Sequence, residues 1–382
     1  MNEQTVRRPD ESRPKSTVFF RPKKRLANEI DFWRGFALVS IFINHIPGIV
    51  LEKITHRNFG ASDSAELFVF LAGFSLRYLS ESRTENLTTP RLFMRLESRT
   101  FTIYAAHLLT VVLALSLLAG AALWFETPLI LQWHNAQTFF QEPVQSIIGI
   151  AGLSYQLGYF DVLPLYVVLM AFAPFIVILH RFAPAFLLPV SILIWAATLF
   201  YEANVPTWPI EGRWFFNPAA WQLCFVTGFV LARPTGIGAW TRANHYWLRW
   251  VGFLIVAIGF VITWFDLWPD PFAVPQPYLF FIFDKTYLSP GRFLHLLGLV
   301  ALVSGIYVWL DKLYIFQYFG SFFALLGRNS LNVFCAGSLL SQAGQITRFA
   351  APVSVTTDLV VVILGVMIMI AVAWMNEWRK RL

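Results

Sequence analysis

The sequence has few charged residues for its length. Only 13% of its 382 residues are Asp, Glu, Lys or Arg, whereas 57% are hydrophobic, and a soluble domain averages about 25% charged residues. A chain this apolar cannot bury its side chains in one water-soluble core, and no polar stretch is long enough for a separate soluble domain. The composition therefore predicts an all-α polytopic membrane protein.

Other absences exclude further classes of protein. The only two cysteines, Cys224 and Cys335, lie inside apolar runs, so no disulfide framework is expected. Spacings typical of metal ligands, glycine-rich phosphate loops and a Gly-x-Ser-x-Gly elbow are also missing. We therefore expect no metal, no bound cofactor, and no ATPase or serine hydrolase chemistry. The net charge of +7 does not indicate nucleic acid, because Lys and Arg gather in segments typical of cytoplasmic loops.

Apolar runs dominate the chain from residue 30 onwards. We expect ten membrane spans, at about residues 30–51, 63–81, 98–123, 162–180, 184–200, 216–232, 247–266, 292–310, 329–346 and 357–375. With the N-terminus in the cytoplasm, inside segments hold 22 Lys or Arg and outside segments hold six, which predicts that both termini are cytoplasmic. The expected parts are a basic disordered tail (1–29), a transmembrane domain (30–376) and a basic cytoplasmic end (377–382).

The first predicted span carries polar residues that are costly in hydrocarbon. Asp31, Arg34, Asn44 and His45 each need protein or a watery cavity around them. On a helix, Arg34 and His45 would lie about 16 Å apart along the axis and nearly on one face. His45 is the leading candidate for a catalytic base, since an imidazole can take a proton from an attacking hydroxyl. Arg34 either holds an anionic donor or pairs with Asp31 and reaches the surface.

Carboxylates open two later spans. Asp63 and Glu66 lie three residues apart, so on a helix they share a face. One of them could orient the His45 imidazole, as in a catalytic triad, or both could cap the helix N-terminus. Asp161 is likewise either a cap or a ligand for an acceptor.

Aromatic residues accompany polar ones in the predicted outside loops at residues 124–161, 201–221 and 264–292. Such mixtures suit a carbohydrate, although Trp and Tyr are also common at membrane interfaces. Asn217, Trp221 and Gln222 are spaced so that they could face one cavity at the start of the sixth span.

Several sequence blocks resemble one family. RLANEIDFWRGFALVSIFINHIPG and RNFGASDSAELFVFLAGF are similar to the OpgC family, as are DVLPLY, NPAAWQLCF and GRNSLNVFCAGSLLS. The resemblance covers about residues 26–376. The type member of the family is the membrane succinyltransferase of osmoregulated periplasmic glucans. The family belongs to the wider acyltransferase-three group, whose motif separates Arg or Lys from His by ten residues; Arg34 and His45 match it.

The resemblance implies an O-acyltransferase in the bacterial inner membrane. Acyl-CoA, with succinyl-CoA as the expected donor, would bind from the cytoplasm as co-substrate, and the acyl group would pass to a hydroxyl of a periplasmic glycan. His45 would activate that hydroxyl, and Arg34 would help to hold the donor. Arg57 or Arg292 would bind the free carboxylate of a succinyl group.

In the same mechanism, Asp63, Glu66 and Asp161 would orient the base or the sugar.

Two other classes of protein stay open. An ion-coupled transporter of a glycan or organic anion would also use an intramembrane Arg and His, although no inverted repeat is visible. A glycan-binding subunit would need neither. Only the enzyme predicts that His45→Ala abolishes acyl transfer in a protein that still inserts.

Overall fold

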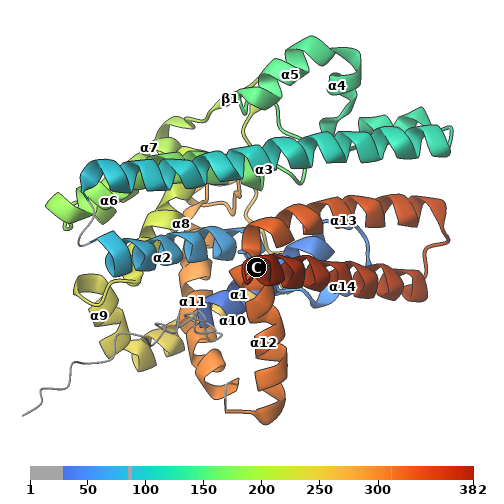
Figure 1. The fold of residues 1–382 in the computed structure, drawn as a ribbon. Helices are drawn as coiled ribbons and strands as arrows, with labels where there is room; N and C mark the ends of the chain where they lie inside the picture. The colour runs from blue at the N-terminus through green and yellow to red at the C-terminus, as the bar shows by residue number, and fades with distance from the viewer. Residues whose placement is uncertain (1–28, 85–87, 311) are drawn as a thin grey trace, which may run out of the picture.

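The computed structural model describes residues 29–84, 88–310 and 312–382, and this part of the chain is mainly helical (Figure 1). The one strand pair is β1 (Pro206–Thr207) with β2 (Gly212–Arg213), which is antiparallel. The all-α prediction is therefore confirmed. The predicted tail lies outside the described residues, apart from Glu29.

Fourteen α-helices and four short 3-10 helices make up the described chain. The α-helices are α1 (Glu29–Asn44), α2 (Ser64–Thr84), α3 (Thr89–Trp124), α4 (Gln137–Gln141), α5 (Pro143–Ala151), α6 (Val162–Phe182), α7 (Leu187–Tyr201), α8 (Pro218–Leu231), α9 (Gly236–Ala243), α10 (His245–Trp264), α11 (Pro290–Leu310), α12 (Tyr314–Arg328), α13 (Ser330–Ala350) and α14 (Val355–Arg379). The 3-10 helices are η1 (Val50–Ile54), η2 (His56–Phe59), η3 (Pro128–Asn135) and η4 (Tyr278–Phe280). Each predicted span overlaps one α-helix, and α12 lies in the interval 311–328, which no predicted span covers.

In the described part of the chain, five helices are long and apolar enough to cross a membrane, namely α3, α6, α10, α11 and α14. The pair α8 and α9 would make a sixth if it is one span bent by 72°. These helices make the chain a multi-pass membrane protein. The full count of ten crossings and the cytoplasmic position of the termini stay predictions.

Helix α1 packs against α12, α2 and α13. It touches α12 backbone to backbone, because a Cβ at Gly35 would lie 1.9 Å from the Phe323 carbonyl oxygen, and one at Gly327 would lie 1.8 Å from that of Asp31. The helix is shorter than the predicted span of residues 30–51. Pro47 has no N–H to continue the helix, and Gly48 takes a left-handed φ of +75°.

Helices α1 and α13 run side by side in the same direction. Arg34, near the start of α1, donates a hydrogen bond to the Ser330 hydroxyl at the start of α13. At the other end, Gln345 of α13 donates to the carbonyl of His45. We call these two ends of the pair the Glu29 end and the Asn44 end. Helix α14 lies alongside α13, while α4 and α5 lie on the far side of α3 from both (Figure 1).

Candidate active site

A cavity of about 540 Å³ lies at the Asn44 end. Its walls come from the end of α1, the segments before α2 and α6, and the loops before α8 and α11. The polar and aromatic residues that line it include Asn44, His45, Arg57, Ser62, Asp63, Asn135, Tyr159, Asp161, Phe215, Phe216, Trp268, Lys285 and Arg292. The cavity thus brings together five of the predicted site residues: His45, Arg57, Asp63, Asp161 and Arg292.

His45 is the first residue beyond α1. Its N–H still donates to the Ile41 carbonyl at 3.0 Å, so the residue continues the helical path of α1 at the end opposite Arg34. The buried Nδ1 of its ring has no hydrogen-bond partner in the described part of the chain. A cavity-lining imidazole with an unengaged nitrogen can accept a proton from a bound hydroxyl.

Tyr159 stands between two histidines. Its ring centroid lies 4.7 Å from that of His45 and 5.2 Å from that of His134. Burial raises the pKa of the Tyr159 phenol and lowers the pKa of His134, so both are neutral near pH 7. A neutral phenol in this place can donate a hydrogen bond into the cavity.

The backbone around these rings is strained. Tyr159, His134 and Asn135 have φ values of +68°, +58° and +64°. These lie in the left-handed region of the backbone, which residues other than glycine rarely adopt. Strain of this kind persists only where the surrounding structure imposes it, and it is concentrated at functional sites. The segment that brings Tyr159 and His134 to His45 is therefore held in place at an energetic cost.

A cluster of four charges lies at the cavity: Asp63, Lys285 and Arg292 line it, and the fully buried Glu66 is bonded to Arg292. The Lys285 ammonium lies 2.5 Å from an Asp63 carboxylate oxygen, and Arg292 donates two hydrogen bonds to one Glu66 oxygen, at 2.8 and 2.5 Å. Asp63 also accepts from the Ala65 N–H at 2.8 Å, and Glu66 from the Asp63 N–H at 3.0 Å. These bonds match the capping interpretation of the two carboxylates. In the described chain neither carboxylate hydrogen-bonds to His45, so the expected orienting role is not observed.

The two predicted carboxylate-binding arginines differ in exposure. The Arg292 side chain is only 11% exposed and is already bonded to Glu66. Arg57 pairs with Glu52 at 3.4 Å, and its side chain is 52% exposed at the cavity mouth. Only Arg57 of the two can therefore meet an incoming anion without breaking a buried ion pair.

Three predicted acceptor-binding residues do not line the cavity, which corrects that expectation. The Asn217 side chain caps α8, accepting from the Ala219 N–H at 3.1 Å. Trp221 is fully buried and donates to the Lys285 carbonyl at 3.0 Å. Gln222 bonds to Ser191 across to α7. Their polar groups are used by neighbouring segments, so Trp221 supports the site only indirectly, through the backbone of Lys285.

The cavity residues Tyr159, Trp268 and Lys285 were not singled out from the sequence, and neither was His134, which does not line the cavity but contacts the Tyr159 ring. All four lie in the predicted outside loops that combine aromatic and polar residues, so composition marked the segments. Only the folded loops show which of their side chains reach His45.

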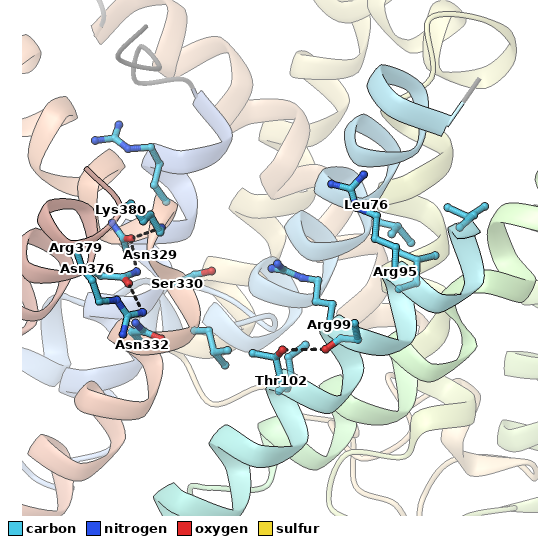
Figure 2. Close-up of a pocket in the computed structure, with 16 residues that line it drawn as sticks. Leu76, Arg95, Arg99, Thr102, Asn329, Ser330, Asn332, Asn376, Arg379 and Lys380 are labelled. Carbon is cyan, nitrogen blue, oxygen red and sulfur yellow. Dashed lines mark hydrogen bonds between the residues drawn. The ribbon is translucent and has the colours of Figure 1, made fainter. Parts of the chain in front are cut away.

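A second pocket, of about 460 Å³, lies at the Glu29 end. Among the described residues, five cations and no carboxylate line it: Arg95, Arg99, Arg328, Arg379 and Lys380. Figure 2 shows Arg95 and Arg99 of α3 facing the residues of α13 and the end of α14 across this pocket. We call it the cationic pocket.

Neutral side chains organise the α13–α14 wall of the cationic pocket. The Asn329 side-chain oxygen accepts from Lys380 at 3.1 Å and from Asn376 at 2.7 Å (Figure 2). Arg34 is not among the lining residues, but its partner Ser330 is. Arg34 is therefore one hydrogen bond away from this pocket, at the end of α1 that lies away from His45.

Comparisons with known proteins give one relationship. No curated protein and no solved structure shows significant similarity to the chain. The profile of one family, described as OpgC protein, matches residues 26–381, which is nearly the whole sequence. The chain is therefore a member of the OpgC family.

Proposed function

We propose that this chain is a membrane-embedded O-acyltransferase that moves an acyl group from acyl-CoA to a hydroxyl of a periplasmic glycan. Membership of the OpgC family supports a role in the modification of osmoregulated periplasmic glucans. The observation that carries the proposal is the placement of two unlike pockets at the two ends of α1. One is cationic, and the other contains His45.

The cationic pocket suits the donor. Acyl-CoA carries its phosphates at one end of a long flexible arm and its thioester at the other. Arginines bind phosphate through paired N–H donors. Arg328 is paired with Glu377 at 2.8 Å, so the lining cations outside that pair are Arg95, Arg99, Arg379 and Lys380, and these four favour a multiply charged anion. The Glu29 end would then face the cytoplasm, and the arm would extend along α1 over the roughly 16 Å between Arg34 and His45.

The cavity at the Asn44 end suits the acceptor. Trp268, Phe215 and Tyr159 offer ring faces that can cover the C–H surfaces of a sugar, and Asp161 and Asn135 can take its hydroxyls. The charges of Asp63 and Lys285 compensate each other, as a neutral glycan requires. Arg57 at the mouth is placed for the carboxylate of a succinyl group.

In the proposed reaction His45 takes the proton of the glycan hydroxyl as its oxygen attacks the thioester carbonyl. The carbon–sulfur bond then breaks, and the imidazolium returns the proton to the leaving thiolate. The product is an ester on the glycan plus free CoA. The Tyr159 phenol can donate to the negative oxygen that develops on the carbonyl.

The test uses purified protein in liposomes with labelled succinyl-CoA or acetyl-CoA inside and glucan outside. Esterified glucan and stoichiometric release of CoA are expected, with the better donor identifying the acyl group. His45→Ala should lower the rate by about 10²- to 10⁴-fold while acyl-CoA binding is retained. The exposed His245 provides the matched control, and His245→Ala should be fully active.

Two results would overturn this function. One is an unchanged rate in His45→Ala. The other is passage of glucan or organic anion across the bilayer with no acyl-CoA consumed, which would identify a transporter.

A further inference from the structure

The C-terminus of α1 is capped by side chains from another helix. The last carbonyls of a helix lack partners within it, and here α13 supplies them. Ser341 donates to the Phe42 carbonyl at 3.0 Å, and Gln345 donates to the carbonyl of His45 itself. Arg348 donates to the next two exposed carbonyls, those of Pro47 at 2.6 Å and Gly48 at 3.0 Å.

The three donors form one stripe on α13. Residues 341, 345 and 348 are spaced four and three apart, so they share a face of the helix. They meet the carbonyls at the end of α1 in sequence order, which follows from the parallel course of α1 and α13. The stripe therefore fixes both where α1 stops and how the chain leaves it.

Arg348 is itself held by α14. Its Nε lies 3.2 Å from a carboxylate oxygen of Asp358, which is 1% exposed. The other oxygen of Asp358 accepts from the Val50 N–H at 2.8 Å. The segment from residue 45 to residue 50 is thus bonded on both sides to the α13–α14 pair. The positive Arg348 also lies at a helix C-terminus, where a cation is favoured.

We infer that Gln345, Arg348 and Asp358 are positioning residues that set the place and direction of the His45 imidazole. The inference rests on the proposed role of His45 as the base. His45 directly follows the last residue of α1 and lies two residues before Pro47; α1 holds its N–H through the Ile41 carbonyl, whereas its own carbonyl is held by Gln345 of α13. The ring direction follows from that backbone, and a displacement of about 1 Å at a reacting group can cost 10²-fold in rate.

The experiment changes the bonds without removing the ion pair. Arg348→Lys keeps a cation for Asp358, but a single ammonium cannot reproduce the guanidinium fork on two carbonyls. Gln345→Met keeps the side-chain length and removes the bond to the His45 carbonyl, together with the contact of Gln345 with His134. Each variant should lower kcat about 10- to 100-fold, with the KM for acyl-CoA within twofold of wild type.

Two further measurements separate positioning from a general loss of folding. Rates are expressed per molecule that binds acyl-CoA, and the modification rate of His45 by diethyl pyrocarbonate is followed by mass spectrometry. A displaced imidazole should react at a changed rate in both variants. The control is Thr347→Val in the same turn, because the Thr347 hydroxyl bonds to Ala343 of its own helix.

The outcomes are distinct from those of the proposed function. Wild-type kcat and His45 modification rates in both variants would overturn the inference, even if His45→Ala is inactive. Full activity of His45→Ala would instead overturn the catalytic role on which the inference rests.

Discussion

Lys285 and Asp63 form an ion pair of 2.5 Å across 222 residues of sequence. The pair joins the segment before α2 to the loop before α11, and both residues line the cavity that contains His45. The Lys285 ammonium also lies 5.7 and 5.4 Å from the ring centroids of Phe215 and Phe216. One cation thus ties together three of the segments that enclose the candidate active site.

The first prediction concerns this pair. Asp63→Asn keeps the shape of the side chain but leaves the mostly buried Lys285 without its closest anion. We expect a loss of about 1–3 kcal/mol in stability, below the value for a fully buried pair because the Lys285 side chain is 27% exposed. The measurement is the free energy of unfolding in detergent. The double variant Asp63→Asn with Lys285→Met should lose less stability than the sum of the losses in the two single variants. Losses that add exactly would argue against an interaction between the two residues.

The second prediction concerns the contact of Tyr159 with His45. Tyr159→Phe keeps the ring against the imidazole but removes the phenolic donor, whereas Tyr159→Ala removes both. If the phenol stabilises the developing oxyanion, Tyr159→Phe should lower kcat about 10- to 100-fold with little change in KM. Tyr159→Ala should be slower still. Equal, near-wild-type rates for the two variants would show that Tyr159 only packs.

The positions of the helices can be predicted from the sequence, but the residues at which they end are predicted less accurately. Long apolar runs predict helices because the backbone must satisfy its own hydrogen bonds in hydrocarbon. Composition does not show where a run bends or stops. Pro47 and Gly48 end α1 several residues before the apolar run is over, and α12 is a 15-residue helix, shorter than a membrane span requires.

Some residues of the candidate site can be identified from the sequence alone. Arg34 and His45 are examples, because a polar side chain within an apolar run costs free energy in a membrane unless a function or a partner requires it. Lys285 and Tyr159 are not, because their place beside His45 depends on loops more than 100 residues away. Helical spacing also shows which side chains share a face but not which neighbours use them, as Gln222 and its bond to Ser191 demonstrate.

The third prediction concerns the cationic pocket. Arg99→Gln should raise the KM for acyl-CoA about tenfold or more without lowering kcat at saturation, because the lost bonds hold the donor in ground and transition states alike. The same change should weaken the salt dependence of donor binding. The matched control is Arg181→Gln, since Arg181 is exposed and lies away from the pocket.

Comparison of CoA with dephospho-CoA identifies the phosphate that the pocket recognises. Wild-type protein should prefer CoA, and the preference should shrink in Arg95→Gln or Arg99→Gln if either guanidinium contacts the extra phosphate. Unchanged donor binding in both variants, with reduced retention of anionic lipid, would assign the pocket to a lipid headgroup instead.

The fourth prediction concerns Asp161, which precedes α6 and lines the cavity. Burial raises the pKa of its carboxyl to about 6, compared with about 3.9 in an unfolded chain. The folded protein therefore binds more protons than the unfolded chain between about pH 4 and pH 6. The contribution of Asp161 to stability falls as the pH rises through this range and is constant above it. Asp161→Asn has no charge to bury, so its stability relative to wild type should increase as the pH rises from 4 to 6.

The measurement is the thermal midpoint from pH 4 to pH 8, with the exposed Asp270→Asn as control. A constant difference between Asp161→Asn and wild type over that range would mean that the carboxyl titrates normally in the folded protein.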